Sequence, residues 1–363
     1  MNANFLNLSP EELAAALSEM GEPAYRAGQI FSWMHKGVTL SGMSDLPKKL
    51  RASLAERGEV FFPEVVRKLV SKIDGTTKYL FSLADGQMIE SVVMRYKYGN
   101  TICISSQVGC RMGCRFCAST LGGKVRDLEP GEMLGQIIAA EKDLGERISH
   151  VVMMGIGEPM DNYDNVVKFL RLVNHEKGLN ISYRAISVST CGVAEKIRKL
   201  AEEDFPITLS ISLHASDDET RSAIMPVNNK YPLDVLMPAC RYYFDRTGRR
   251  ISFEYTLIAG KNDDTASAGR LAELLHRHFG RNCPVHVNLI PLNEVKERGL
   301  KTSTPKSVRA FQEKLDSLGI NATVRRTLGP DIQASCGQLR RRELDGEAPV
   351  TAENAGEEER TPD

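Results

Sequence analysis

The sequence contains no hydrophobic run that approaches the ~20 apolar residues of a membrane-spanning helix, so we expect no membrane association. Aromatic residues are scarce, at 6% with a single tryptophan, but 42% of the 363 residues are hydrophobic, which excludes a disordered chain. The N-terminal stretch MNANFLNLSPEEL lacks the basic and then apolar pattern of a secretory signal. We therefore expect a cytoplasmic protein of roughly two to three domains.

The net charge of zero conceals a difference between the body of the chain and its tail. Residues 343–363 hold eight acidic residues and one base, Arg360, which leaves 46 bases against 39 acids in residues 1–342, a surplus of seven. A basic body permits a polyanionic partner without demonstrating one. The tail is rich in Ala, Gly and Glu, and we expect it to be a disordered, solvated appendage.

Changes in residue pattern predict five segments along the chain. These are helices over 1–60, a small β-meander over 61–100, alternating strands and helices over 101–327, a loop over 328–342 and the acidic tail 343–363. The alternating part gives six βα units with short apolar strands, which predicts an α/β fold with a parallel sheet covered by helices. An open doubly wound sheet and a partial barrel both satisfy this pattern. In either fold, ligands bind at the carboxyl ends of the strands.

Three of the eight cysteines form the strongest chemical signal, the C-x3-C-x2-C run of Cys110, Cys114 and Cys117. In a reducing compartment, clustered cysteines indicate a metal or catalysis rather than disulfides. A structural zinc site takes four ligands, and no fourth cysteine or histidine lies nearby in the sequence. A [4Fe–4S] cluster bound by three cysteines leaves one iron open for a substrate or cofactor. Zinc with a distant fourth ligand is the alternative.

Polar residues and glycines recur at the ends of successive predicted strands. They are Gly157 with Glu158, then Ser189, then Ser212-Leu213-His214, and finally Asn293. One such residue is usually a capping group, but their recurrence at the same end of the sheet favours a ligand pocket. Glycine allows the backbone to approach a ligand, and a carboxylate such as Glu158 can accept a hydrogen bond from an ammonium group.

The cysteine run and the stretch Met154-Gly-Ile-Gly-Glu-Pro159 resemble the signatures of the radical S-adenosylmethionine (radical SAM) superfamily. The resemblance implies a partial (β/α)6 barrel and a [4Fe–4S] cluster on Cys110, Cys114 and Cys117. It also implies that the open iron chelates SAM, which one electron cleaves to a 5′-deoxyadenosyl radical. The strand-end residues of the preceding paragraph would then contact SAM.

Further motifs over roughly residues 5–342 resemble the RlmN/Cfr family of ribosomal RNA adenine methyltransferases. They include Glu90-Ser-Val-Val-Met94, Cys103-Ile-Ser-Ser-Gln-Val-Gly-Cys110 and Gly329-Pro-Asp-Ile-Gln-Ala-Ser-Cys336. The resemblance implies methylation of adenine C2 with two SAM molecules per turnover. The first methylates Cys336, and the radical from the second takes a hydrogen atom from that methyl group. The resulting methylene radical adds to C2, Glu90 removes the C2 proton, and Cys103 attacks the sulfur of Cys336, releasing the product through a transient disulfide.

The same resemblance implies 23S ribosomal RNA and transfer RNA as substrates, an electron donor such as flavodoxin or ferredoxin, and a monomer. Arginines at 325–326 and 340–342 would contact phosphates, residues 1–60 would add a second RNA-binding surface, and the target base would be flipped out. Lys124-Val-Arg-Asp127 and Gly329-Pro-Asp331 depart from the family pattern. Two alternatives stay open: an adenine-C8 methyltransferase of the same family, and a non-catalytic metal-containing RNA-binding protein.

Overall fold

A ten-stranded sheet forms the centre of the computed structural model, which describes residues 3–281, 285–332, 334, 339, 340 and 343. The strands, in spatial order, are β14 (Ala322–Val324), β13 (Val285–Pro291), β12 (Ile251–Leu257), β11 (Thr208–Ser212), β10 (Ile186–Thr190), β9 (Ile148–Met153), β6 (Gly99–Cys103), β5 (Met88–Tyr96), β4 (Thr77–Ser82) and β3 (Glu64–Val70). The strands from β14 to β6 are parallel, whereas β5, β4 and β3 continue the sheet in antiparallel pairing. The predicted meander is therefore continuous with the parallel sheet.

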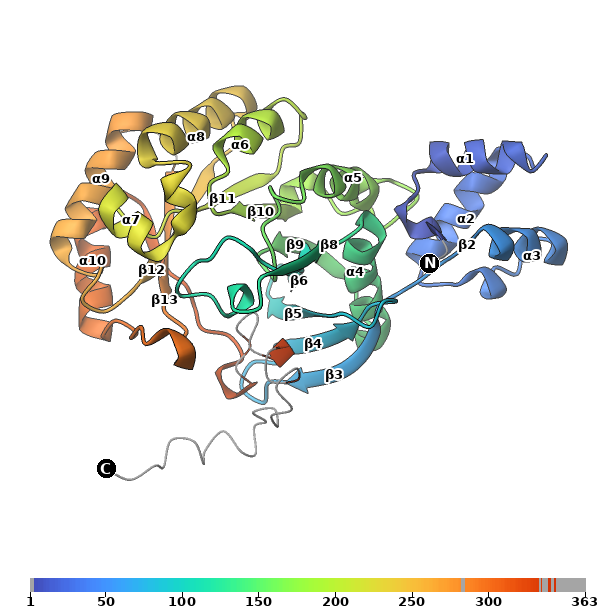
Figure 1. The fold of residues 1–363 in the computed structure, drawn as a ribbon, viewed down its shortest axis with the longest axis horizontal. Helices are drawn as coiled ribbons and strands as arrows, with labels where there is room; N and C mark the ends of the chain where they lie inside the picture. The colour runs from blue at the N-terminus through green and yellow to red at the C-terminus, as the bar shows by residue number, and fades with distance from the viewer. Residues whose placement is uncertain (1–2, 282–284, 333, 335–338, 341–342, 344–363) are drawn as a thin grey trace.

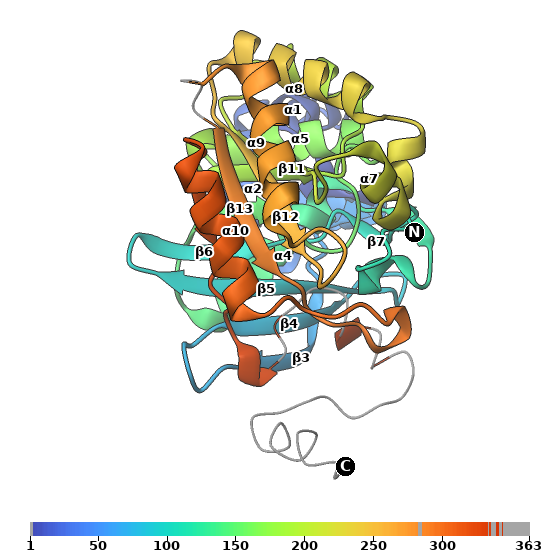
Figure 2. The same ribbon diagram turned by 90° about the vertical axis from the view of Figure 1, so that its left-hand side faces the viewer.

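Helices cover the outer face of the parallel strands (Figures 1 and 2). They are α4 (Pro130–Leu144), α5 (Tyr163–Asn174), α6 (Ala194–Ala201), α7 (Asp218–Ile224), α8 (Leu233–Thr247), α9 (Thr265–Phe279) and α10 (Pro305–Ser317). Each of the longer ones turns an apolar stripe to the sheet, as α5 does with Val166, Phe169, Leu170 and Val173. The sheet and its helices form the partial barrel that the sequence predicted, and none of the helices described is long and apolar enough to cross a membrane.

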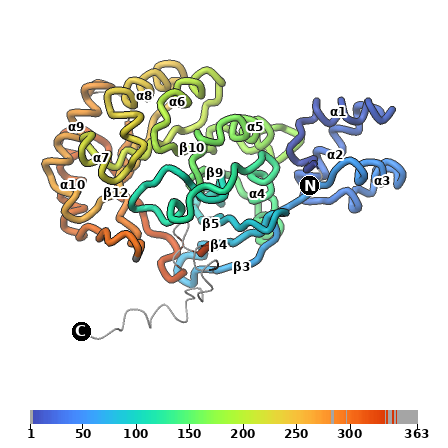
Figure 3. Tube along the Cα trace, in the orientation of Figure 1, coloured from blue at the N-terminus to red at the C-terminus, as the bar shows by residue number. Residues whose placement is uncertain are grey.

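Three N-terminal helices pack beside α4 and α5, on the side of the barrel away from α9 and α10 (Figure 3). They are α1 (Pro10–Glu19), α2 (Tyr25–His35) and α3 (Lys48–Arg57). Ser9 followed by Pro10 predicts the start of a helix, and the structure has a capping box there, in which Ser9 and Glu12 satisfy each other's backbone N–H groups. The amide of Asn7 connects this region to the start of α4, because its Oδ1 accepts from the N–H of Gly131 at 2.7 Å.

The first core strand ends earlier than the sequence predicted. The residue pattern predicts a strand over Ile102–Gln107, but β6 ends at Cys103, and β7 (Gln107–Gly109) forms a separate pair with β8 (Lys124–Asp127). Between them, the backbone turns against the loop after β9, where the Gly155 N–H donates to the carbonyl of Ile104 at 3.0 Å. A Cβ at position 155 would lie 2.5 Å from that carbonyl oxygen, so glycine permits the approach.

Candidate active site

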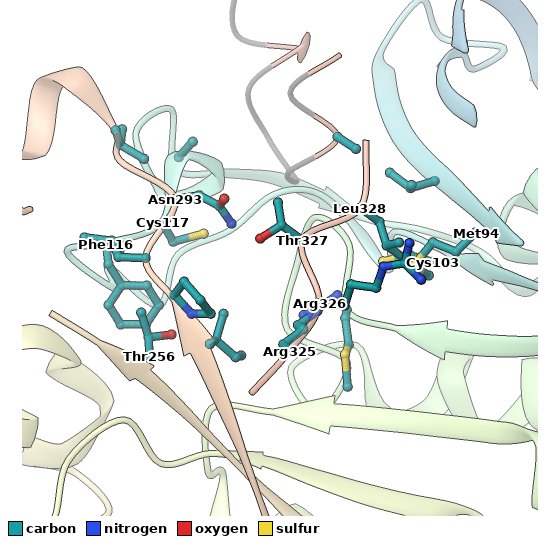
Figure 4. A pocket seen from close by; sticks show the side chains of 18 residues that line it. Met94, Cys103, Phe116, Cys117, Thr256, Asn293, Arg325, Arg326, Thr327 and Leu328 are labelled. Atoms are coloured by element: carbon teal, nitrogen blue, oxygen red, sulfur yellow. The ribbon is translucent and has the colours of Figure 1, made fainter. Parts of the chain in front are cut away.

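Two adjoining cavities lie at the carboxyl ends of the parallel strands. The first, of about 220 Å³, is lined by the three motif cysteines and by residues after β9, β10 and β11, and we name it the cysteine-loop cavity. The second, of about 250 Å³, is lined by Cys103, Asn293 and Arg326 among others, and we name it the Cys103 cavity (Figure 4). The residues common to both walls are Phe116, Cys117, Met154, Thr256, Ile290 and Arg325. Molecules bound in the two cavities would therefore be neighbours.

The β7–β8 pair holds the loop that carries the three motif cysteines. The Cys110 N–H donates to the carbonyl of Gly123 at 2.9 Å, which closes the base of the loop. Gly109 has a φ of 75°, and a Cβ there would lie 1.9 Å from the same carbonyl oxygen. The Thr120 hydroxyl donates to the carbonyls of Cys114 and Cys117 at 3.1 and 3.0 Å. The fold thus fixes the loop by its backbone and leaves the thiols to line the cavity.

The electrostatics of these thiols fit a bound iron–sulfur cluster. Burial raises the pKa of Cys110 to about 12, with the charges of Glu158 and Cys117 adding to the rise. Burial and the two neighbouring cysteines also raise the pKa of Cys114. Three adjacent thiolates therefore need a cationic centre, and thiolates are the ligands of such clusters. Within the described ranges, no three His, Cys, Asp or Glu side chains are close enough to hold a single metal ion.

Glu158 lies on the wall of the cysteine-loop cavity with its carboxylate fixed by backbone groups. Its Oε2 accepts from the N–H of Cys191 at 2.7 Å, and its Oε1 accepts from the N–H of Met160 at 3.0 Å. Burial raises its pKa, and these hydrogen bonds oppose the rise. The preceding Gly157 has a φ of 114° and lies so close to Gln107 that a Cβ would be 2.7 Å from that side chain. The predicted Gly-Glu pair is thus a rigid element of the wall.

His214 is a neutral hydrogen-bond donor in the same wall. Its Nδ1 accepts from the backbone N–H of Thr256 at 2.9 Å, so the neutral ring carries its proton on Nε2. Burial lowers its pKa to about 3, and the charge of Arg221 contributes. The ring of Phe116 lies edge-on at 4.8 Å between centroids. Ser189 and Ser212 line the same cavity.

Leu213 and Asn293 occupy different places from the other predicted cofactor residues. The Leu213 side chain is buried and lines neither cavity; its carbonyl accepts from Arg221 Nε at 3.1 Å. Arg221 is itself fully buried and also donates to the carbonyl of Cys191 at 2.7 Å, so it holds the ends of β10 and β11 together. Asn293 lines the Cys103 cavity instead of the cysteine-loop cavity.

Two residues of the cysteine-loop cavity were not predicted from the sequence. Cys191 matches none of the sequence motifs, which predicts a structural role, but it lines the cavity with its thiol hydrogen-bonded to Glu158. Glu254 lies inside β12, accepts from Asn288 Nδ2 at 2.6 Å and from Ser252 Oγ at 2.9 Å, and has a pKa raised by burial. Glu254 could have been predicted as a site residue because a carboxylate in the middle of an apolar strand is unusual.

The predicted catalytic residues come from neighbouring strands. Cys103 pairs with Val92 across β6 and β5, and both line the Cys103 cavity. Glu90 lies two residues before Val92 in β5 and is not part of the cavity lining; it is buried, with its Oε2 3.2 Å from Lys78 Nζ. Its Oε1 accepts from the backbone N–H of Arg340, a residue of the predicted C-terminal loop. Cys336, Arg341, Arg342 and most of the acidic tail lie outside the described residues.

The segments that depart from the family pattern make specific contacts. In β8, Lys124 Nζ lies within 3.0 Å of Asp127 and Asp161 carboxylate oxygens. In the C-terminal loop, Asp331 accepts from Ser71 Oγ at 2.7 Å and from the Lys72 N–H at 2.9 Å. The turn between β3 and β4 thus binds the loop shortly before Cys336.

Comparisons with known proteins agree with this geometry. Residues 104–271 match the family model of the radical SAM superfamily, and residues 3–60 match that of the ribosomal RNA large subunit methyltransferase N-terminal domain. The probable dual-specificity RNA methyltransferases RlmN of Lachnospira eligens and Clostridium perfringens (strain 13) are each 52% identical to this chain, covering 93% of it and 96% of their own length. The crystal structure of a radical SAM methyltransferase from Sphaerobacter thermophilus has a TM-score of 0.87 and 43% identity, covering 92% of this chain and 98% of its own.

The barrel, the cysteine loop and the cavity beside it define a radical SAM protein. Within that superfamily, the chain belongs to the RlmN family of RNA methyltransferases. Membership implies that it binds a [4Fe–4S] cluster and S-adenosylmethionine.

Proposed function

We propose that this chain methylates C2 of an adenine in 23S ribosomal RNA, at the peptidyl transferase centre, and of an adenine next to the anticodon in transfer RNA. The observation that carries the proposal is the wall shared by the two cavities, which includes Cys117 and Met154. A cofactor in the cysteine-loop cavity would lie beside a base in the Cys103 cavity, and Cys336 would carry the methyl group from one to the other. The arginines of the Cys103 cavity, Arg325 and Arg326, suit an anionic RNA strand.

The residues of the cysteine-loop cavity suit the cofactor. A [4Fe–4S] cluster held by Cys110, Cys114 and Cys117 would supply, when bound, the electron that cleaves SAM to its 5′-deoxyadenosyl radical. Glu158 would accept a hydrogen bond from the SAM ammonium group, and the His214 Nε2 proton would be available to a SAM oxygen or nitrogen. The cavity would serve two SAM molecules in each turnover, the first of them the methyl donor to Cys336.

The protein's own groups would complete the transfer. Cys336 would carry the methyl group to C2, and Glu90 would accept the C2 proton. Cys103, on the cavity wall, would attack the sulfur of Cys336 as a thiolate, so that the disulfide forms as the carbon–sulfur bond breaks. The electron pair of that bond would go to the methyl carbon, which would take up a proton. Flavodoxin or ferredoxin would supply electrons, and the chain would act as a cytoplasmic monomer.

The test is mass spectrometry of anaerobically reconstituted protein incubated with SAM, a reductant and protein-free ribosomal RNA. We expect 2-methyladenosine in the RNA and a methyl group on the Cys336 peptide, with both absent in Cys336→Ala. The matched control is Cys240→Ala, a buried cysteine of α8 that lines neither cavity, and it should keep both products. Formation of 8-methyladenosine would overturn the C2 assignment. SAM cleavage without RNA methylation would overturn the assignment of this RNA as the substrate.

A further inference from the structure

The β5–β6 hairpin carries two stacked aromatic rings that remain open to solvent. The Tyr96 and Tyr98 ring centroids lie 5.0 Å apart at an interplanar angle of 7°. The Tyr98 side chain is 63% exposed and that of Tyr96 is 38% exposed. His150 of β9 contacts Tyr98 edge-on, at 4.9 Å between centroids. Figure 2 shows the hairpin projecting beyond the neighbouring strands. Single exposed apolar residues are ordinary, but a stacked and solvent-exposed ring pair indicates a binding surface.

This aromatic pair is connected to the Cys103 cavity. The Tyr96 hydroxyl lies 3.7 Å from the sulfur of Met94, which lines the cavity. Because side chains alternate along a strand, Tyr96 lies on the same face of β5 as Met94 and Val92. Tyr98 precedes Cys103 by five residues, about 16 Å along an extended strand. The rings are therefore near enough for one RNA strand to contact both them and the cavity.

Positive charge lies between the rings and the cavity. Arg325 and Arg326 follow β14 and line the Cys103 cavity. Burial raises the pKa of Tyr96, and the charges of both arginines oppose that rise, so both lie within electrostatic range of its ring. In the part of the chain that the structure describes, neither guanidinium forms an ion pair with a carboxylate within 4.0 Å. Both arginines line the Cys103 cavity, and the charge of Arg325 also lowers the pKa of Glu254 against the rise caused by burial.

We propose that Tyr96 and Tyr98 form a stacking platform for an unpaired nucleobase of the RNA substrate, a few nucleotides from the methylated adenine, while Arg325 and Arg326 contact the intervening phosphates. Aromatic faces stack on unpaired bases of any sequence, and guanidinium groups neutralise the strand. The platform would hold the strand while the target adenine is flipped into the Cys103 cavity. The inference rests on the proposed RNA methylation, because it assigns a position to the substrate of that reaction.

The test measures binding of protein-free 23S ribosomal RNA and transfer RNA to the reconstituted holoenzyme. Tyr98→Leu keeps an apolar side chain but removes the aromatic face, and should weaken RNA binding roughly 5- to 150-fold, the range of one lost base stack. Tyr98→Trp should restore it. The matched control is Tyr242→Leu on α8, another exposed tyrosine, which should bind RNA as the unchanged protein does. Arg326→Gln should lower the slope of log affinity against log salt by about one.

A second arm separates stacking from a folding defect. Short RNAs carrying one abasic nucleotide, scanned through the positions flanking the target adenine, should bind the unchanged protein weakly when the stacked base is missing. For Tyr98→Leu, which lacks the aromatic face, this abasic RNA and the intact RNA should bind with equal affinity. Methyl transfer to Cys336 in the absence of RNA should be equal in Tyr98→Leu, Tyr98→Trp, Tyr242→Leu and the unchanged protein. Equal binding of intact RNA by Tyr98→Leu and the unchanged protein would overturn the platform, whereas RNA binding without any methylation would overturn the proposed function instead.

Discussion

Lys78 Nζ and Glu90 Oε2 lie 3.2 Å apart on neighbouring antiparallel strands, with 1% of each side chain exposed. Ions so deeply buried are stable only when paired, because each loses its hydration. The pair therefore holds the proposed proton acceptor in place on β5, two residues before the cavity-lining Val92, and the Arg340 N–H bonded to the same carboxylate joins it to the C-terminal loop.

Removing the ammonium group should destabilise the fold. Lys78→Met leaves the Glu90 carboxylate buried without this cation, and should lower the free energy of unfolding by about 3–5 kcal/mol. The double variant Lys78→Met/Glu90→Gln should recover part of that loss, since neither position then carries a charge. Urea unfolding measures both. Lys230→Met, at a lysine whose side chain is 70% exposed, should change stability by less than about 0.5 kcal/mol. A loss no larger in Lys78→Met than in Lys230→Met would contradict the account.

A loss of stability is also expected on changing Arg221, whose guanidinium donates to the carbonyls of Leu213 and of Cys191, a residue that lines the cysteine-loop cavity. Arg221→Lys keeps the charge but cannot reproduce the planar set of donors, so buried carbonyls lose their partners. We expect a loss of about 2–4 kcal/mol and weaker SAM binding, measured by thermal unfolding and by titration calorimetry. Arg246→Lys, at an exposed ion pair, is the control and should leave both unchanged. Unaltered SAM affinity in Arg221→Lys would show that the shape of the cysteine-loop cavity does not depend on this guanidinium group.

The sequence alone was sufficient to predict those parts of the site whose residues are close together in the chain. The spacing of Cys110, Cys114 and Cys117 on one loop required no knowledge of packing. Six apolar strands alternating with helices predicted the parallel sheet, and the resemblance to the radical SAM superfamily was needed to choose the partial barrel over an open sheet. Contacts that depend on register could not be predicted. The Lys78–Glu90 pair exists because Leu80 is paired with Glu90 across β4 and β5. The contact between Cys191 and Glu158 likewise needs the ends of β9 and β10 at one level, and early termination of β6 depends on the close passage at Gly155.

Two buried histidines predict how stability changes with pH. Burial lowers the pKa of His214 to about 3 and that of His35 to about 4, whereas an unfolded chain has the ordinary value of 6.5. Below pH 6.5 the unfolded state therefore binds protons that the folded state does not, and stability falls as pH falls. Each histidine should contribute up to about 1.4 kcal/mol per pH unit down to its folded pKa. Urea unfolding between pH 7 and 5 measures the slope.

The corresponding variant is His35→Gln, because His35 lies in α2, far along the chain from the cofactor residues. It should reduce the slope of unfolding free energy against pH over pH 5–6 by the contribution of one proton, about 1.4 kcal/mol per pH unit. His278→Gln, at a histidine that is not fully buried, should change the slope less. If His35→Gln and the unchanged protein had the same slope, the buried neutral state of His35 would be refuted.

Cluster binding should depend on glycine at a single position of the cysteine loop. Gly109→Ala would place a Cβ 1.9 Å from the carbonyl oxygen of Gly123, at a φ of 75° that alanine adopts only with strain. The β7–β8 closure must then open, and the three thiols lose their common orientation. We expect reconstituted Gly109→Ala to retain less than half of the bound iron and of the visible cluster absorbance. Gly122→Ala lies in the same loop with no atom within 4 Å of the added Cβ, so it should bind iron fully. Equal iron contents in the two variants would show that the loop closes around the cluster without this backbone contact.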